Sequence, residues 1–187
     1  MLTFEAYLKS TAEAGGMINI LFEQRLFALV GILERIAIPL KSEEIPYELI
    51  GGVAVMVHVN GADSSAVRNT KDVDIMVHKA DLDRIIEAAG QHGFTFDHIR
   101  LVCTGEKVRP NQAIPNPPLR PEHHSILGVD VAVISVSDLV QMKLSNNRDI
   151  DRVHVDDMDQ VGLITREVEK ALPPNLAKRL EEIRGNR

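Results

Sequence analysis

The chain has 187 residues, of which 44% are hydrophobic, enough for one sizeable domain or a domain with a small appendage, without disulfide bonds. Its 27 acidic and 21 basic residues argue against a broad surface for duplex nucleic acid, and the lack of Trp leaves little aromatic surface for stacking single-stranded bases. A single cysteine, Cys103, and the lack of a signal segment or a long apolar run predict a cytoplasmic protein with no membrane segment.

The first predicted elements are a helix and a short strand. Apolar residues recur at intervals of three and four from about Ile18, which predicts an amphipathic helix that ends before Pro39 and covers one face of the core. Residues 47–50 form the first predicted strand, and the pair Gly51-Gly52 would stop it.

The segment after the glycine pair has two interpretations. Valines alternate with other residues over positions 53–59, and this β-branched pattern favours a hairpin that turns at Gly51-Gly52. In the competing interpretation, the glycines form a turn into a short buried helix whose free N–H groups point at a phosphate. The local sequence leaves both interpretations open.

Two aspartates share one face of the next predicted strand, residues 72–77. A residue period of two places Asp72 and Asp74 on the same side, with Val73 and Ile75 on the other side. Neighbouring carboxylates repel each other unless a cation lies between them. The pair therefore predicts a divalent metal site.

The rest of the chain is predicted to contain helices, a long loop and one more strand. The expected elements are a helix over 81–91, an extended segment over 94–102, a proline-rich loop over 105–124, a strand over 126–134, and helices that start near 137, 155 and 173. In the strand, Asp130 shares one face with the small residues Gly128 and Ala132. This arrangement leaves space for a ligand beside the carboxylate.

Several polar residues have plainer structural explanations. His123 and His124 have no third metal ligand at a suitable spacing, so we expect them to be solvated at the end of the loop. We expect His58 and His154 to be ordinary polar residues at the edge of the core. Taken alone, Lys143 is expected to be a helix lysine that extends its ammonium group into water.

Several stretches in this order resemble the nucleotidyltransferase superfamily to which polymerase beta belongs. They are Gly51-Gly52, the segment 68–71 leading into Asp72-Val73-Asp74-Ile75, Val129-Asp130-Val131, the helix 137–144 and the run 152–157. In the later stretches the chain looks most like minimal bacterial nucleotidyltransferases related to the abortive-infection toxin proteins. The resemblance covers about residues 46–163 and implies an α/β fold with a short mixed sheet. Helices would pack on one side of this sheet and leave an open, carboxylate-lined face on the other, with an added N-terminal helical segment (1–40) and a C-terminal helical extension (164–187).

The resemblance also implies a reaction: Mg²⁺-dependent transfer of NMP from an NTP to a hydroxyl on a small molecule, protein or RNA, with release of pyrophosphate. The implied catalytic residues and ligands of two Mg²⁺ ions are Asp72, Asp74 and Asp130. The implied phosphate-binding residues are Gly51, Gly52, Lys143, Arg68 and Lys71. Asp157 matches an acidic position in the family's last helix, where it would orient Lys143 or simply pack.

Two questions stay open. Nineteen residues separate Gly52 from Asp72, more than in the compact polymerase-like pattern, so the sequence does not show that the glycine turn meets the metal site. The alternative function is a non-catalytic nucleotide-binding or partner-binding module of the same fold, such as a component of a toxin–antitoxin pair. A protein partner or a homodimer is compatible with either function.

Overall fold

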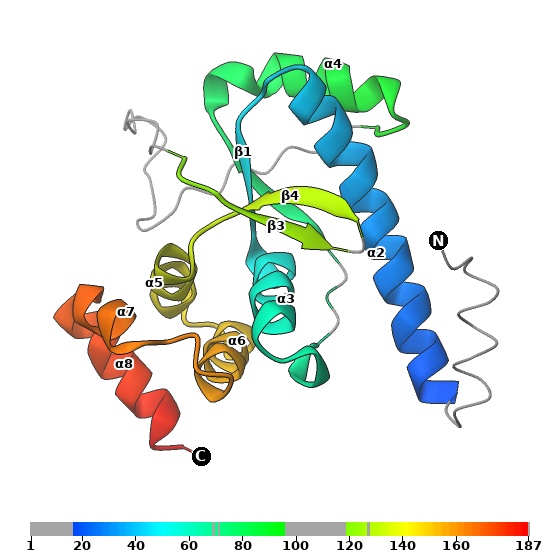
Figure 1. Cartoon of the computed structure of the whole chain (residues 1–187). Coiled ribbons are helices and arrows are strands. Elements are labelled where there is room, and N and C mark those ends of the chain that lie inside the picture. The colour runs from blue at the N-terminus through cyan, green and yellow to red at the C-terminus, as the bar shows by residue number, and fades with distance from the viewer. Residues whose placement is uncertain (1–16, 69, 71, 96–118, 127, 187) are drawn as a thin grey trace.

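The computed structural model describes residues 17–68, 70, 72–95, 119–126 and 128–186. Its centre is a four-stranded mixed sheet in the order β2-β1-β4-β3, flanked by helices (Figure 1). The strands are β1 (Tyr47–Ile50), β2 (Asp74–Val77), β3 (Glu122–Ile126) and β4 (Val129–Val133). β1 runs antiparallel to β2 and parallel to β4, and β3 runs antiparallel to β4. The predicted α/β class with a short mixed sheet and flanking helices is confirmed.

The described helices include one at each end of the described chain (Figure 1). Their bounds are α2 (Met17–Ser42), α3 (Gly51–Ala62), α4 (Leu82–Gln91), α5 (Val136–Asn146), α6 (Asp149–Gln160), α7 (Arg166–Ala171) and α8 (Pro174–Arg184), with short 3₁₀ turns at Ser64–Ala66 and Lys79–Asp81. Among the described residues, none of these helices is long and apolar enough to cross a membrane.

The segment after the glycine pair is a helix, so the hairpin interpretation is wrong. α3 begins directly at Gly51, which has a φ of +70° that favours glycine. All seven residues from Val53 to Val59 are buried. α3 packs against the sheet and against α5 and α6, so its side chains are buried on all sides. β-branched residues are tolerated in this helix because burial outweighs their local preference for strands.

Three element boundaries differ from the prediction. α2 continues through Pro39 to Ser42, because the fully buried Leu40 holds its last turn in the core and a proline ring fits helical φ angles. The predicted strand over 126–134 corresponds to β4, and its first residue, Ile126, is the end of β3; Gly128 with φ +90° lies between the two strands. β2 begins at Asp74, so Asp72 lies just before the strand.

The helices after the sheet also differ in extent. α6 begins at Asp149, about six residues earlier than predicted, and α7 was not predicted. The predicted last helix is confirmed as α8, which buries Leu176, Leu180 and Ile183. The predicted segments 94–102 and 105–124 lie largely outside the described residues.

Helices contact both faces of the sheet, so the expected open face is not observed. His58 of α3 lies beside Glu122 of β3, whereas Lys41 of α2 lies 3.8 Å from Asp130 of β4. The strand register places Glu122 and Asp130 on opposite faces of the sheet. Glu122 pairs with Val133 and shares its face, and Asp130, three residues before Val133 on the same strand, lies on the other face. On the face with Asp130, Glu48 is buried and its carboxylate accepts a hydrogen bond from the backbone N–H of Arg120.

Candidate functional site

The glycine turn and the acidic strand meet at the carboxyl end of β1. Antiparallel pairing places Asp74 opposite Ile50, the residue before Gly51. A Cβ atom built on Gly51 would lie 2.2 Å from Oδ2 of Asp74, so only glycine allows this carboxylate to lie here. The Asp74 carboxylate is exposed and lies at the N-terminus of α3, where backbone N–H groups have no partner within the helix. Strand pairing thus brings Asp74 to the glycine turn, although the two are distant in the sequence.

Replacement of Gly51 by alanine should destabilise the fold, because the positive φ is strained for alanine and the new methyl group would displace Asp74. We expect a loss of at least about 1–2 kcal/mol in the free energy of unfolding, measured by chemical denaturation. Gly61→Ala is the matched control: it lies in the same helix with open space around it, and should be neutral or stabilising by up to about 1 kcal/mol. Equal effects of the two substitutions would contradict this geometry.

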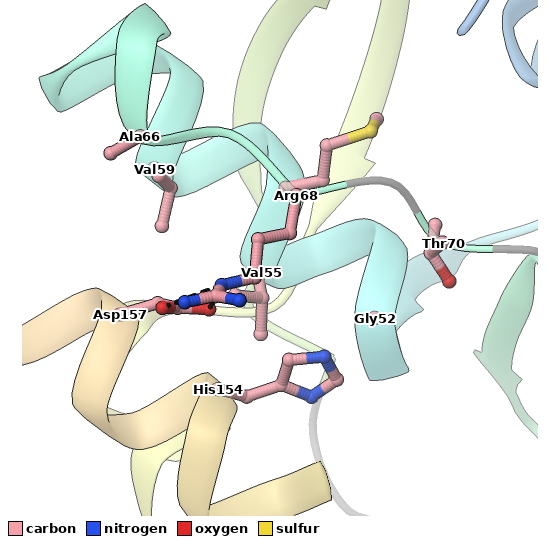
Figure 2. Close-up of a pocket in the computed structure, with 9 residues that line it drawn as sticks. Gly52, Val55, Val59, Ala66, Arg68, Thr70, His154 and Asp157 are labelled. Carbon is pink, nitrogen blue, oxygen red and sulfur yellow. Dashed lines mark hydrogen bonds and ion pairs between the residues drawn. The ribbon is translucent and has the colours of Figure 1, made fainter. Parts of the chain in front are cut away.

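Beside the turn, a small cleft lies between α3, the segment before β2, and α6 (Figure 2). A Cβ atom on Gly52 would lie 2.6 Å from Oγ1 of Thr70 and 3.7 Å from Cε1 of His154. On the other side of the cleft, Arg68 Nε lies 2.8 Å from Oδ2 of Asp157. Asp157 therefore holds Arg68 at the cleft, and the structure does not pair Asp157 with Lys143.

Lys143 is buried in an ion-pair network and does not extend into water. Its Nζ lies 3.1 Å from Oδ1 of Asp151, which is fully buried and also accepts a 2.6 Å hydrogen bond from Nε of Arg148. Burial alone would raise the pKa of Asp151, but the hydrogen bonds and charges of Arg148 and Lys143 outweigh it and hold that pKa below its usual value. The carboxylate thus stays ionised and fixes both cations.

Arg148 links this network electrostatically to Asp74. The pKa of Arg148 is raised first by its hydrogen bond to Asp151, then by the charge of Asp151, and further by the negative charge of Asp74. The Arg148 side chain is 67% exposed, so part of its guanidinium group is accessible to a ligand. Arg148 and Asp151 were not predicted as site residues; the signal for them in the sequence was an acidic residue eight positions after a helix lysine, with an arginine between.

His154 lies next to this network and inside the cleft (Figure 2). Its Nδ1 atom is buried and has no hydrogen-bond partner among the described residues. Burial lowers the pKa of His154, and the nearby charge of Lys143 lowers it further. The ring is therefore neutral at pH 7 and has an open hydrogen-bonding position, which differs from the ordinary edge residue that we predicted.

The buried histidines predict a pH dependence of stability. In the unfolded chain His154 takes up a proton below about pH 6.5, whereas the folded protein resists this until lower pH. The unfolded state therefore binds more protons in this window, so the free energy of unfolding should fall as pH decreases, by at most about 1.4 kcal/mol per pH unit for each histidine. The pKa of His58 is also lowered by burial and acts in the same direction.

Denaturation of the parent and of His154→Gln at about pH 7.5 and about pH 5.5 measures this effect. The variant should lose part of the pH dependence, whereas His123→Gln, at an exposed position, should keep all of it. An unchanged dependence in His154→Gln would contradict a buried neutral ring.

The remaining predicted residues lie elsewhere or outside the described chain. Asp72 is exposed and precedes β2 by two residues. Ile134, directly after β4, donates its backbone N–H to the carbonyl oxygen of Leu49, next to the glycine turn. Asp130 lies four residues before Ile134, so it is at the far end of β4 from Asp74. Within the described residues, the three aspartates do not form a group of potential metal ligands. Lys71 and Cys103 lie outside the described residues.

Comparisons of the chain with models of protein families, with curated proteins and with solved structures found no match. Its chemistry is therefore inferred from the residues and their geometry. The N-terminus of α3 attracts anions. Arg68 lines the cleft together with Gly52, and Arg148 interacts electrostatically with Asp74. Asp74 lies at the same helix terminus, and a carboxylate beside a phosphate is unfavourable unless a cation lies between them. The site therefore suits an anion that arrives together with a divalent metal ion.

Proposed function

We propose that the chain is a Mg²⁺-dependent nucleotidyltransferase, which moves an NMP group from an NTP to a hydroxyl acceptor and releases pyrophosphate. The observation that carries the proposal is the position of the Asp74 carboxylate against Gly51, at the N-terminus of α3. An aspartate and a glycine turn that are distant in sequence lie against each other, which supports the arrangement that the resemblance implies. The order of motifs along the chain supports the same reaction.

The residues at this site suit Mg²⁺. Asp74 supplies exposed carboxylate oxygens, the ligands that Mg²⁺ prefers, at the helix terminus that would hold the phosphates. Asp72, two residues earlier in the chain, is also exposed and would be a second ligand, as the resemblance implies. When bound, Mg²⁺ would neutralise charge on the triphosphate and on the departing pyrophosphate. The resemblance also implies Asp130 as a third ligand, but we do not propose it as one, because it lies at the far end of β4 from Asp74.

The chain's own groups bind and orient the nucleotide. The N–H groups at the start of α3 would donate hydrogen bonds to phosphate oxygens, and Arg148 would supply positive charge beside them. Lys143 acts indirectly, because its ammonium group is buried against Asp151 and helps to position the carboxylate that holds Arg148. His154 lines the cleft, with its Cε1 atom turned toward Gly52.

A second candidate function is a non-catalytic module that binds nucleotides through the same site. The position of Asp130, away from Asp74 and beside Lys41, favours this candidate, because metal-dependent transfer by this superfamily implies a third carboxylate. Such a module would bind Mg²⁺-NTP but form no product.

Incubation with Mg²⁺ and each α-labelled NTP, together with cell extract, tests the proposal. A transferase should form a labelled product and release pyrophosphate, and treatment of the product with protease or ribonuclease should identify the class of acceptor. If NTP stabilises the protein against heat and no product forms, the non-catalytic candidate is supported. If there is neither stabilisation nor product, both candidates fail.

A further inference from the structure

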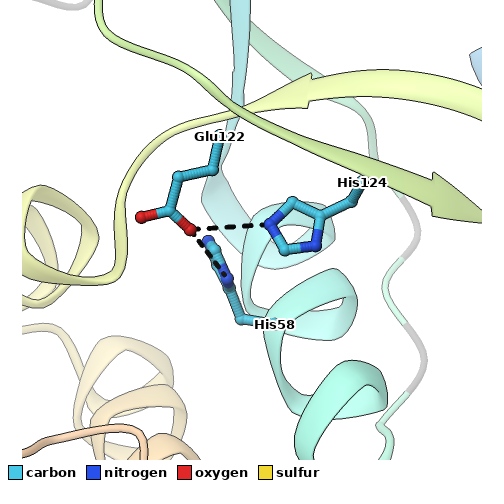
Figure 3. Close-up of side chains that lie close together, drawn as sticks. All are labelled: His58, Glu122 and His124. Carbon is cyan, nitrogen blue, oxygen red and sulfur yellow. Dashed lines mark ion pairs between the residues drawn. The ribbon is translucent and has the colours of Figure 1, made fainter.

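Three metal-binding side chains converge on the face of the sheet that packs against α3 (Figure 3). They are His58 of α3, and Glu122 and His124 of β3. Nδ1 of His58 lies 4.0 Å from Oε2 of Glu122, and Nε2 of His124 lies 3.5 Å from the same oxygen. The three ligand atoms all lie within 4.8 Å of one another. This group lies on different residues from the proposed nucleotide site.

The hydrogen bond of His58 fixes which of its nitrogen atoms is free. Nε2 lies 2.8 Å from the backbone carbonyl oxygen of Ile134, so Nε2 carries the hydrogen and donates a hydrogen bond to this oxygen. In the neutral ring, Nδ1 then presents a lone pair toward the Glu122 carboxylate. A histidine that binds metal through one nitrogen and donates from the other to a backbone carbonyl is a common arrangement at metal centres. His58 is thus already oriented as a ligand.

The second histidine is also unsatisfied. Nε2 of His124 is buried and makes no hydrogen bond in the described part of the chain, although Glu122 lies close by. A buried polar atom without a partner costs free energy. A cation between the three ligand atoms would satisfy both nitrogens and the carboxylate together.

We propose that His58, Glu122 and His124 bind one divalent transition-metal ion, of which Zn²⁺ is the best match. Two imidazole nitrogens and one carboxylate favour Zn²⁺ over Mg²⁺, which prefers oxygen ligands. Ligand atoms of a tetrahedral Zn²⁺ lie about 3.3 Å apart, close to the observed 3.5 and 4.0 Å, so small side-chain rotations would complete the geometry. Three protein ligands leave a fourth position open for water or a small ligand. The ion would also tie α3 to β3.

The sequence did not predict this site because its ligands are far apart along the chain. His123 and His124 were expected to lie in a solvated loop, but both belong to β3. Strand alternation turns His124 toward α3 and His123 to the opposite face, where it is exposed. His123 therefore provides a control that differs from His124 by one position.

Metal binding by the purified, tag-free full chain tests the proposal. After treatment with a chelator, Zn²⁺ is titrated by calorimetry, and Co²⁺ is titrated by visible absorption, which reports tetrahedral coordination. The parent and His123→Ala should bind one ion per chain. His124→Ala and Glu122→Gln should bind at least about tenfold more weakly. Both substituted side chains are partly exposed, so these variants should fold, and circular dichroism checks this.

Two results would overturn the proposal: no saturable binding of Zn²⁺ by the parent, or binding by His124→Ala and Glu122→Gln that equals that of the parent. Asp74→Asn separates this site from the nucleotide site. That variant should bind Zn²⁺ as the parent does, whatever its behaviour with NTP, because Asp74 is not among the three ligands.

Discussion

Replacement of Asp74 by asparagine is expected to abolish nucleotidyl transfer, with a loss of at least about 100-fold, and to remove the thermal stabilisation by Mg²⁺-NTP. Asparagine keeps the size of the side chain, so the contact with Gly51 stays possible, but it removes the charge that would attract the metal ion. Label transfer and thermal shift, each with and without Mg²⁺, measure the two effects.

Asp130→Asn is the matched control for this prediction. Asp130 is 72% exposed on its side chain and lies next to Lys41, at the opposite end of β4 from the glycine turn. The variant should therefore keep its thermal response to Mg²⁺-NTP. If Asp130→Asn loses the response and Asp74→Asn keeps it, the nucleotide site does not lie at the N-terminus of α3.

Replacement of Lys143 by methionine should have the largest effect on stability. Methionine preserves the length and the helix propensity of the side chain. It removes the ammonium group, so the fully buried Asp151 keeps only Arg148 as an ion-pair partner in the network described above. Removal of one member of a buried ion pair typically costs several kcal/mol, and we expect a loss of about 3 kcal/mol in the free energy of unfolding. Chemical denaturation at neutral pH measures it.

The control for Lys143→Met is Lys41→Met. Lys41 pairs with Asp130, but both side chains are more than 70% exposed, so its loss should change stability by no more than about 0.5 kcal/mol. A phosphate-binding Lys143 that is free in solution would behave differently: its substitution would weaken NTP binding and leave stability unchanged. That outcome would contradict the buried network.

Local sequence patterns predicted the elements whose local preferences agree with their packing. β1 and the last helix were found because apolar periodicity and Pro or Gly boundaries point to the same structure there, and the strand with Asp74 was found from its alternating pattern. The segment 53–59 needed tertiary information. Its valines suit a strand by propensity, and only burial on all sides of α3 decides for a helix.

The candidate site was only partly predictable for a similar reason. Asp74 and the glycine pair could be found as motifs, but their contact depends on the register of β1 with β2. Asp130 was grouped with them by order along the chain, which does not reveal at which end of a strand a residue lies. The roles of Asp151 and His154 depend on burial, and the group of His58, Glu122 and His124 depends on the packing of α3 against β3.

The most direct test is to locate the nucleotide in an experimental structure determined with Mg²⁺ and a non-hydrolysable NTP. We expect the phosphates to lie at the N-terminus of α3, beside Gly51 and Gly52, with the metal ion bound by Asp74 and with Arg148 facing the phosphates. A nucleotide bound at another surface, or phosphates at α3 without a metal ion on Asp74, would contradict the proposed site.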